Sequence, residues 1–257
     1  MNKYVNVKME EEVACIELNN PESLNALSLS LLNDLLDALD ETETNPQVKM
    51  IVLSGSGRAF CAGGDIRKMQ NSAIDDNKKM DRVAAVLFKM IRSKKTIIAA
   101  VHGYAMGGGF ALACCSDLVF AEEDAQFGLS QGKLGLTADL GLNYFLSHLL
   151  GPWKAKELIY TATVISASDG KSYGFINRIV PKGTVKSEAL QFAKKLVKGP
   201  VLAHGFTKRI INQAYFQGID DTVLHENNAQ SILKQTGDFL EGVQAFKEKR
   251  TPEFLGR

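Results

Sequence analysis

The sequence predicts an α/β fold built on a parallel sheet. Short apolar runs rich in β-branched residues recur along the chain, helical patterns separate them, and glycine-rich turns follow two of the runs. This order of strand, helix and strand is typical of crossover connections between parallel strands. The 257 residues, 45% of them hydrophobic, supply enough apolar side chains for the core of one large domain.

The first predicted unit runs from a strand at 13–18, through a helix, to a strand at 48–55. Leucines between 31 and 39 recur at helical spacing and form one apolar stripe, while aspartates fall on the opposite face. Ser28 or Ser30 is expected to cap the start of this helix, because a serine hydroxyl can accept from a free N–H group there.

The same alternation continues through the middle of the chain. The next predicted elements are a helix at 80–93, a strand at 96–103, a helix entered through glycines at 107–117, and strands at 118–122 and 174–181. No exact sequence repeat is present. The alternation of strand and helix still predicts a repeating βα or ββα architecture.

The C-terminal part of the chain has a different character. Four helical patterns follow one another, at 187–198, 201–217, 219–236 and 238–250, and no strand pattern occurs among them. Such a tail is too small to bury a core of its own. We therefore expect residues 1–195 to form the core with the active site. Residues 196–257 should form a helical region that packs on this core or on a neighbouring subunit.

Charge and composition argue against several classes of protein. The net charge is +1 with both signs interspersed, which argues against binding to nucleic acid. No run approaches the ~20 apolar residues of a membrane span, and the N-terminus lacks the apolar core of a signal peptide. The cysteines form no CxxC motif, and no histidine lies at ligand spacing from a cysteine. We expect a cytoplasmic protein with reduced thiols, no metal and no membrane partner.

Two glycine-rich turns are the main candidate functional motifs, "AFCAGGDI" at 59–66 and "GYAMGGGFALA" at 103–113. Each places glycines directly after a strand, where the backbone can turn tightly and expose N–H groups. If the two turns converge, they would form an oxyanion hole for an enolate or a tetrahedral intermediate. Alternatively, the glycines only permit close packing of helix on sheet. Neither turn matches a nucleotide-binding loop.

Together with "GLTADLG" at 135–141, these motifs resemble the crotonase (enoyl-CoA hydratase/isomerase) superfamily. The resemblance continues through 19–28, 155–180 and 245–254, and it covers essentially the whole chain. It implies a crotonase-like spiral of repeated ββα units with a helical C-terminal region. It also implies a homotrimer or homohexamer and an acyl-CoA substrate. No separate cofactor is expected, because coenzyme A is part of that substrate.

The resemblance also assigns roles to residues. The N–H groups of Gly64 and Gly108 would form the oxyanion hole, which polarises the thioester carbonyl and stabilises the enolate that forms beside it. The loops expected to bracket the adenine and pantetheine of coenzyme A contain Asn25, Ala26, Leu27, Ala62, Asp65 and Ile66. Arg67 and Lys68 could meet the phosphates of coenzyme A, or could form an ordinary solvated helix start.

Hydratases of this family add water with two glutamates, and this chain carries neither of them. Ala111 and Gln131 stand at the two positions, and both are expected to contact the substrate. Neither side chain can move a proton near neutral pH. The resemblance therefore disfavours hydration by the usual route with two carboxylates.

Asp139 is the acid that remains, at the position where double-bond isomerases of the family carry one. The closest local likeness is to dienoyl-CoA isomerases, which pair this acid with a glutamate at the position of Gln131. Apolar neighbours should desolvate the Asp139 carboxyl and raise its pKa towards neutrality, which suits a proton shuttle. The resemblance thus implies an isomerase with Asp139 as the acid/base. Without the resemblance, the residues favour Asp139 as the cap of a helix that begins near Leu140.

Three other functions stay open at the level of sequence. A hydratase or hydrolase could use water held by Gln131 and Asp139. Asp139 could act as a covalent nucleophile, but members that do so need a histidine before the oxyanion glycine in a helix, and no histidine precedes His102. The chain could also be an acyl-CoA-binding protein without catalysis, since both glutamates are missing.

Overall fold

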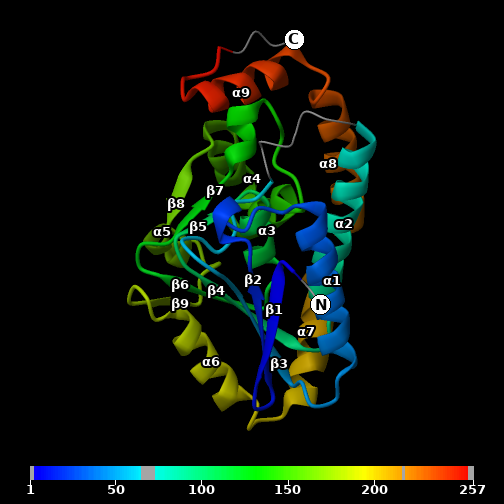
Figure 1. Cartoon of the computed structure of the whole chain (residues 1–257), viewed down its shortest axis with the longest axis vertical. Helices are drawn as coiled ribbons and strands as arrows, with labels where there is room; N and C mark the ends of the chain where they lie inside the picture. The colour runs from blue at the N-terminus through cyan, green and yellow to red at the C-terminus, as the bar shows by residue number, and fades with distance from the viewer. Residues whose placement is uncertain (1–2, 65–72, 216–217, 254–257) are drawn as a thin grey trace.

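The computed structural model describes residues 3–64, 73–215 and 218–253, and a six-stranded sheet forms its centre (Figure 1). The strand order is β1-β2-β3-β4-β6-β9. The strands are Val5–Glu10 (β1), Val13–Leu18 (β2), Met50–Gly55 (β3), Thr96–Val101 (β4), Leu118–Glu122 (β6) and Arg178–Val180 (β9). Strand β1 pairs antiparallel with β2 at one edge, and all other neighbours are parallel. The predicted α/β fold on a parallel sheet is confirmed.

A second sheet of three short strands lies beside the first. It consists of β5 (Tyr104–Met106), β7 (Gln126–Gly128) and β8 (Val164–Ser166), in that order. The chain passes between the two sheets from β4 to β5, from β6 to β7 and from β8 to β9, which gives the expected ββα repetition. The sequence did not reveal these strands, because three residues are too few to show an alternating pattern.

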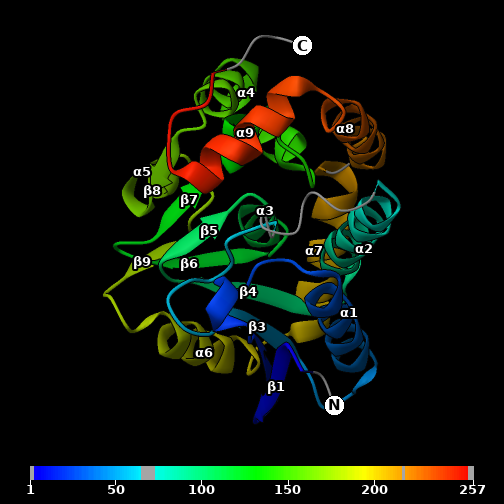
Figure 2. The same ribbon diagram turned by 45° about the horizontal axis from the view of Figure 1, so that its top comes forward.

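Helices cover both faces of the large sheet (Figure 2). The helices of the core are α1 (Leu29–Thr44), α2 (Ala73–Arg92), α3 (Gly108–Cys114), α4 (Leu142–Thr161), α5 (Ala167–Ser172) and α6 (Val185–Leu196), with short 3₁₀ turns η1 (Pro21–Ser23) and η3 (Ser130–Leu134). In β3, Ile51 and Leu53 join the cluster that includes α1 to α4, whereas Met50 and Val52 pack with α6. Burial on both faces explains why β3 reads as an unbroken apolar run.

The ends of two elements differ from the sequence prediction. Helix α2 begins at Ala73 rather than at residue 80, because its first turns, "AIDDNKKM", carry no apolar stripe. Strand β9 covers only Arg178–Val180 of the predicted 174–181. By contrast, Ser28 caps α1 as one of the two expected serines, with its hydroxyl 3.2 Å from the N–H of Leu31.

The C-terminal helices pack on the core. They are α7 (Val201–Tyr215), α8 (Ile219–Leu233) and α9 (Gly237–Glu248). Lys208 anchors α7, because its buried ammonium donates to the carbonyls of Met90 (2.9 Å) and Lys95 (3.0 Å) and pairs with Asp117 (2.8 Å). Helix α8 contacts α2 and α4, and α9 lies on η3 (Figure 1). The tail thus packs on the part of the core that contains α2, α4 and η3.

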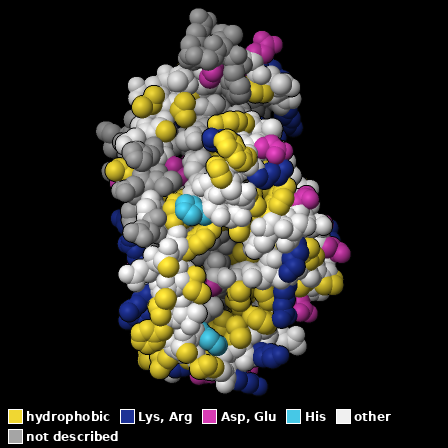
Figure 3. Space-filling model, turned by 180° about the vertical axis from the view of Figure 1, so that it is seen from behind, with side chains coloured by type: hydrophobic (Ala, Val, Ile, Leu, Met, Phe, Trp, Pro, Cys, Tyr) yellow, Lys and Arg dark blue, Asp and Glu magenta, His cyan; other side chains and the backbone are white. Residues whose placement is uncertain are grey.

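One face of α7 carries exposed apolar side chains. Leu202, Phe206 and Ile210 recur every four residues and are 80%, 58% and 64% exposed. We call these three residues the α7 stripe. Figure 3 shows that hydrophobic side chains are widespread on the side of the molecule turned away in Figure 1. A single chain leaves this apolar surface in contact with water.

All four cysteines are free, and burial raises the pKa of Cys61 to about 12. Within the described residues, no three His, Cys, Asp or Glu groups gather as a metal site would require. No helix in the described ranges is long and apolar enough to cross a membrane.

Candidate active site

The two glycine turns meet at the ends of β3 and β4. Gly63 and Gly107 both have positive φ, at 83° and 49°, which favours glycine at these positions. A Cβ on Gly63 would lie 2.4 Å from the carbonyl oxygen of Met106. The segments are joined by hydrogen bonds from the N–H of Cys61 to the carbonyl of Tyr104 (3.0 Å) and from the N–H of Met106 to the carbonyl of Cys61 (2.9 Å). The backbone itself therefore holds the two turns side by side.

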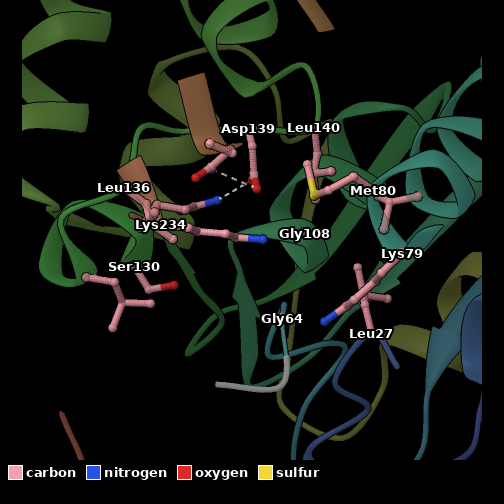
Figure 4. A pocket seen from close by; sticks show the side chains of 15 residues that line it. Leu27, Gly64, Lys79, Met80, Gly108, Ser130, Leu136, Asp139, Leu140 and Lys234 are labelled. Atoms are coloured by element: carbon pink, nitrogen blue, oxygen red, sulfur yellow. Dashed lines mark hydrogen bonds between the residues drawn. The ribbon is translucent and has the colours of Figure 1, made fainter. Parts of the chain in front are cut away.

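Gly64 and Gly108 line one pocket, where these turns converge (Figure 4). Within the described part of the chain, no group accepts a hydrogen bond from either N–H. A Cβ on Gly108 would lie 2.5 Å from Leu27 and 2.9 Å from Leu140, so no larger residue fits there without displacing these side chains. Both amides line the pocket and have no acceptor among the described residues.

The pocket is lined by both apolar and polar side chains. It contains about 690 Å³ of empty space, part of it continuous with solvent. The apolar side chains that line it are Leu27, Met80, Val83, Leu134, Leu136 and Leu140, and the polar ones are Lys79, Ser130, Gln131, Asp139, Gln230 and Lys234. In Figure 4, Lys234 projects into the pocket below Asp139, and Lys79 projects from the opposite side. Asp139 is the one acid among the described lining residues.

Two amide side chains hold the Asp139 carboxylate. Its Oδ1 accepts from Nε2 of Gln131 (2.8 Å), and its Oδ2 accepts from Nε2 of Gln230 (3.1 Å), as Figure 4 shows with dashed lines. Burial raises the pKa of the carboxyl above its ordinary value, and the Gln131 hydrogen bond and the positive charge of Lys234 oppose this only in part. The raised pKa that the sequence predicted is confirmed.

The helix-cap alternative for Asp139 is wrong, because another acid occupies that place. Helix α4 has Gly141 as its N-cap and receives no cap from its own segment's side chains. Instead, Glu226 of α8 accepts from the N–H of Gly141 (2.7 Å) and from the N–H and Nδ2 of Asn143 (3.2 and 2.9 Å). Burial raises the pKa of Glu226 to about 7, although these hydrogen bonds oppose the shift.

Helix α8 supplies groups that the sequence prediction missed. Glu226, Gln230 and Lys234 follow one another at intervals of four, so they lie along one side of the helical segment. Gln230 and Lys234 line the pocket, whereas Glu226 is buried and does not belong to its lining. This polar row was the available sequence signal. Nothing in the sequence indicated that it would meet Asp139, because that contact joins residues far apart in the chain.

The amide of Gln131 lies directly over the second glycine turn. A Cβ on Gly107 would come within 3.1 Å of its Nε2. The Oε1 atoms of Gln131 and Gln230 are buried, and neither has a hydrogen-bond partner within the described residues. Buried amide oxygens are normally paired, so each can accept a hydrogen bond from water or from a ligand.

Asn25, predicted to bind the substrate, has a side chain that holds the surrounding loops together. It is fully buried, and its Nδ2 donates to the carbonyls of Ser56 (2.9 Å) and Ala59 (2.8 Å). Its Oδ1 accepts from the N–H of Asn20 (2.8 Å). These bonds use the side chain inside the protein, so its contribution to the pocket is to fix the loop that carries Leu27.

The other predicted substrate-binding residues fall into three groups. Leu27 lines the pocket, and its N–H donates to the carbonyl of Gly63 (2.7 Å), which ties this loop to the first glycine turn. Three residues lie outside the pocket wall: Ala26, Ala62 and Ala111. Ala111 is fully buried within α3. Four residues lie outside the described part of the chain: Asp65, Ile66, Arg67 and Lys68.

Comparisons with known proteins agree with this fold. Residues 8–257 match the family model described as enoyl-CoA hydratase/isomerase. The chain is 33% identical over 258 residues to the crotonyl-CoA hydratase of Syntrophomonas wolfei, with 99% of each protein covered. An enoyl-CoA hydratase structure from Mycobacterium avium subsp. paratuberculosis matches with a TM-score of 0.90 at 27% identity, over 98% of each chain. The structure of a carnitinyl-CoA hydratase from Mycobacterium avium matches with a TM-score of 0.87 at 32% identity, over 100% of each chain.

The chain therefore belongs to the enoyl-CoA hydratase/isomerase, or crotonase, family. This confirms the resemblance seen in the sequence and is consistent with an acyl-CoA substrate. The family description spans hydration and isomerisation. The side chains around Asp139 bear on the choice between these two reactions.

Proposed function

We propose that the protein isomerises a carbon–carbon double bond in an enoyl-CoA thioester, with Asp139 as the acid/base. The observation that carries this proposal is Asp139 itself, a carboxyl with a raised pKa in a pocket lined by Gly64 and Gly108. An isomerase needs one group that removes a proton and returns it elsewhere. Gln131 and the buried Ala111 offer no second carboxylate at the positions where family hydratases carry one.

The proposed reaction has two proton transfers. The thioester oxygen accepts from the N–H groups of Gly64 and Gly108, which acidifies the adjacent carbon C2. Asp139 removes a proton from C2 of a 3-enoyl-CoA, and the electron pair spreads into a dienolate. Asp139 then gives the proton to C4, and the double bond moves from C3–C4 to C2–C3. No water, metal or separate cofactor enters the balance, since coenzyme A belongs to the substrate.

The test is Asp139→Asn assayed with 3-enoyl-CoA thioesters of several chain lengths. The asparagine keeps the shape of the side chain but cannot take up the proton, so isomerisation should fall by ~10²–10⁴-fold. Asp37→Asn, on the exposed face of α1, is the matched control. Wild-type turnover by Asp139→Asn would contradict the proposal. Binding of acyl-CoA by the wild type without turnover of any enoyl or dienoyl thioester would indicate a binding protein instead.

Hydration is the second candidate, and the unpaired Oε1 of Gln131 favours it. That oxygen could accept a hydrogen bond from one O–H group of a water molecule beside Asp139. Asp139 could then take the proton of the other O–H group. The relative from Syntrophomonas wolfei is named a crotonyl-CoA hydratase. Incubation with crotonyl-CoA decides between the two functions. Loss of the conjugated absorbance would support hydration, whereas stable absorbance together with turnover of a 3-enoyl-CoA would support isomerisation.

We further propose that the chain assembles into a homotrimer or homohexamer and works in the cytoplasm. The α7 stripe supports assembly, because a contiguous exposed apolar surface of this kind is typical of an interface. The C-terminal helices would then serve both subunit contact and closure of the pocket. Phe206→Asp should dissociate the assembly in analytical ultracentrifugation, whereas Thr44→Asp, at the exposed end of α1, should not. A wild-type monomer at micromolar concentration would contradict this proposal.

A further inference from the structure

We propose that Gln230 of α8 is a positioning residue for Asp139, which makes the helical tail part of the catalytic unit. This inference rests on the proposed role of Asp139 as the acid/base. Gln230 touches Asp139 but has no proton to exchange near neutral pH. Its effect on the reaction would therefore pass through the aspartate.

Gln230 makes two contacts with one amide group. Its Nε2 donates to the backbone carbonyl of Thr137 (3.0 Å) and to Oδ2 of Asp139 (3.1 Å). The side chain is only 2% exposed, so its rotation is restricted by its neighbours. One NH₂ group has two hydrogens, and these two acceptors use both. The carboxylate is thereby fixed relative to the backbone two residues earlier.

Gln131 holds the other oxygen of the same carboxylate, at 2.8 Å from Oδ1. With one amide donor on each oxygen, the plane of the Asp139 carboxylate is set from both sides. Each oxygen keeps a further lone pair that can accept a proton. Both partners are neutral amides, which do not exchange a proton near neutral pH. Asp139 would therefore exchange its proton with a group in the pocket. Small errors in the position of such a group are costly in rate, so this support is mechanistically relevant.

Glu226, one helical turn before Gln230, provides a comparison within α8. It accepts from Gly141 and Asn143, and the Nδ2 of Asn143 also donates to the carbonyl of Ala138 (2.5 Å). Glu226 thus fixes the segment around Asp139 but makes no hydrogen bond to its carboxylate. If α8 only stabilised the fold, changes at Glu226 and Gln230 would act alike on the reaction.

The charged groups that face Asp139 define the electrostatic background. Among the described residues, these groups are Lys79 from α2, Glu226 from α8, and Lys234, the residue that follows α8. The two lysines favour the ionised aspartate, and Glu226 and Asp139 disfavour each other's charge. The hydrogen bond from Gln230 lowers the pKa of Asp139, although burial outweighs it. Its removal should therefore raise that pKa further.

The experiment compares Gln230→Met and Gln230→Glu with the wild type. Methionine keeps the volume and removes the donor, so the acid limb of the kcat/KM profile should move up by about one pH unit. Glutamate keeps the shape and adds a like charge beside Asp139, so its acid limb should move further up. In both variants kcat should fall at neutral pH while KM changes little. Gln235→Met is the matched control, because this glutamine is exposed and its side-chain amide donates to the carbonyl of Ser231 (2.9 Å).

A second measurement does not depend on knowing the substrate. The ¹³C carboxyl resonance of Asp139, assigned by its loss in Asp139→Asn, is titrated by NMR in each variant. We expect the pKa of Asp139 to increase from the wild type to Gln230→Met and again to Gln230→Glu. The inference is overturned if both variants fold and show the wild-type titration and acid limb. It is also overturned if Glu226→Gln, which leaves the Gln230 contact in place, reproduces the kinetic changes of both variants.

Failure of the proposed function gives a different result. In that case Asp139→Asn retains turnover, whereas the NMR titration still reports whether Gln230 holds the carboxylate. If Gln230→Met proves unstable in a thermal melt, Gln230→Glu carries the test, since it has nearly the same shape as glutamine.

Discussion

The segment at 135–141 and helix α8 each bring one acid to the same part of the molecule, and the two acids have different surroundings. Asp139 lines the pocket and receives hydrogen bonds from two side-chain amides. Glu226 is buried outside the pocket lining and receives hydrogen bonds from Gly141 and Asn143. Burial raises the pKa of both. A raised pKa alone therefore does not identify the acid that reacts; the groups around each carboxyl are needed as well.

The largest expected effect is a difference in kcat between variants of Asp139 and variants of Glu226. Asp139→Asn should lower kcat by ~10²–10⁴-fold, the range that general acid–base catalysis contributes. Glu226→Gln should stay within about tenfold of the wild type, because its amide oxygen can still accept from the segment that carries Asp139. Steady-state kinetics with a 3-enoyl-CoA checks both variants. Equal losses in the two would remove the distinction between a reacting acid and a supporting one.

The next effect comes from a second acid in the pocket. Gln131→Glu would place a carboxylate where an amide now lies 2.8 Å from Oδ1 of Asp139. Two carboxylates at this distance share a proton, so one apparent pKa of the pair should rise strongly. Isomerisation at pH 7 should fall by roughly tenfold and recover at higher pH. A pH profile of kcat checks this. If hydration of crotonyl-CoA rises in the same variant, the Gln131 position sets the choice between the two reactions.

A smaller effect is the loss of stability expected when the Glu226 side chain of α8 is removed. Glu226→Ala leaves the N–H groups of Gly141 and Asn143 without their partner, which should lower the free energy of unfolding by ~2 kcal/mol. Urea unfolding followed by circular dichroism measures this change. Glu41→Ala, at an exposed position on α1, is the control. An unchanged unfolding midpoint in Glu226→Ala would show that the hydrogen bonds from Gly141 and Asn143 to Glu226 contribute little to stability.

A further effect on stability is a change in its pH dependence. Folding raises the pKa of Glu226 from 4.5 to about 7, so between these values the folded state binds more protons than the unfolded state. The contribution of Glu226 is therefore most favourable below pH 4.5 and is lost as the pH rises to 7. Glu226→Gln should flatten this part of the curve. Unfolding midpoints between pH 5 and 8 check it, and an identical slope in both proteins would contradict the raised pKa.

Much of the fold could be predicted because its signals are local. Each local signal lies within one short segment. The apolar run of a strand is contained within β2, β3, β4 or β6, and the leucine stripe is contained within α1. The glycines at 63 and 107 were recognisable because their position after a strand requires a tight backbone turn. The resemblance to the family then joined these local signals into one site.

The rest of the site depends on contacts between distant residues. Gln230 and Glu226 look like ordinary polar positions of an amphipathic helix until α8 is placed against the segment at 135–141. The short strands β5, β7 and β8 are equally hard to find, because pairing with one another, rather than their own pattern, defines them.

The sequence by itself determined the family, the two glycine turns and the absence of both family glutamates at Ala111 and Gln131. It also determined that Asp139 would lie among apolar neighbours, because those neighbours are adjacent in the chain. Only the tertiary structure decided what the Asp139 carboxylate contacts, which acid caps α4, and that the helical tail supplies part of the pocket wall. The physical reason is that burial follows from local apolar pattern, whereas hydrogen-bond partners follow from the packing of separate elements.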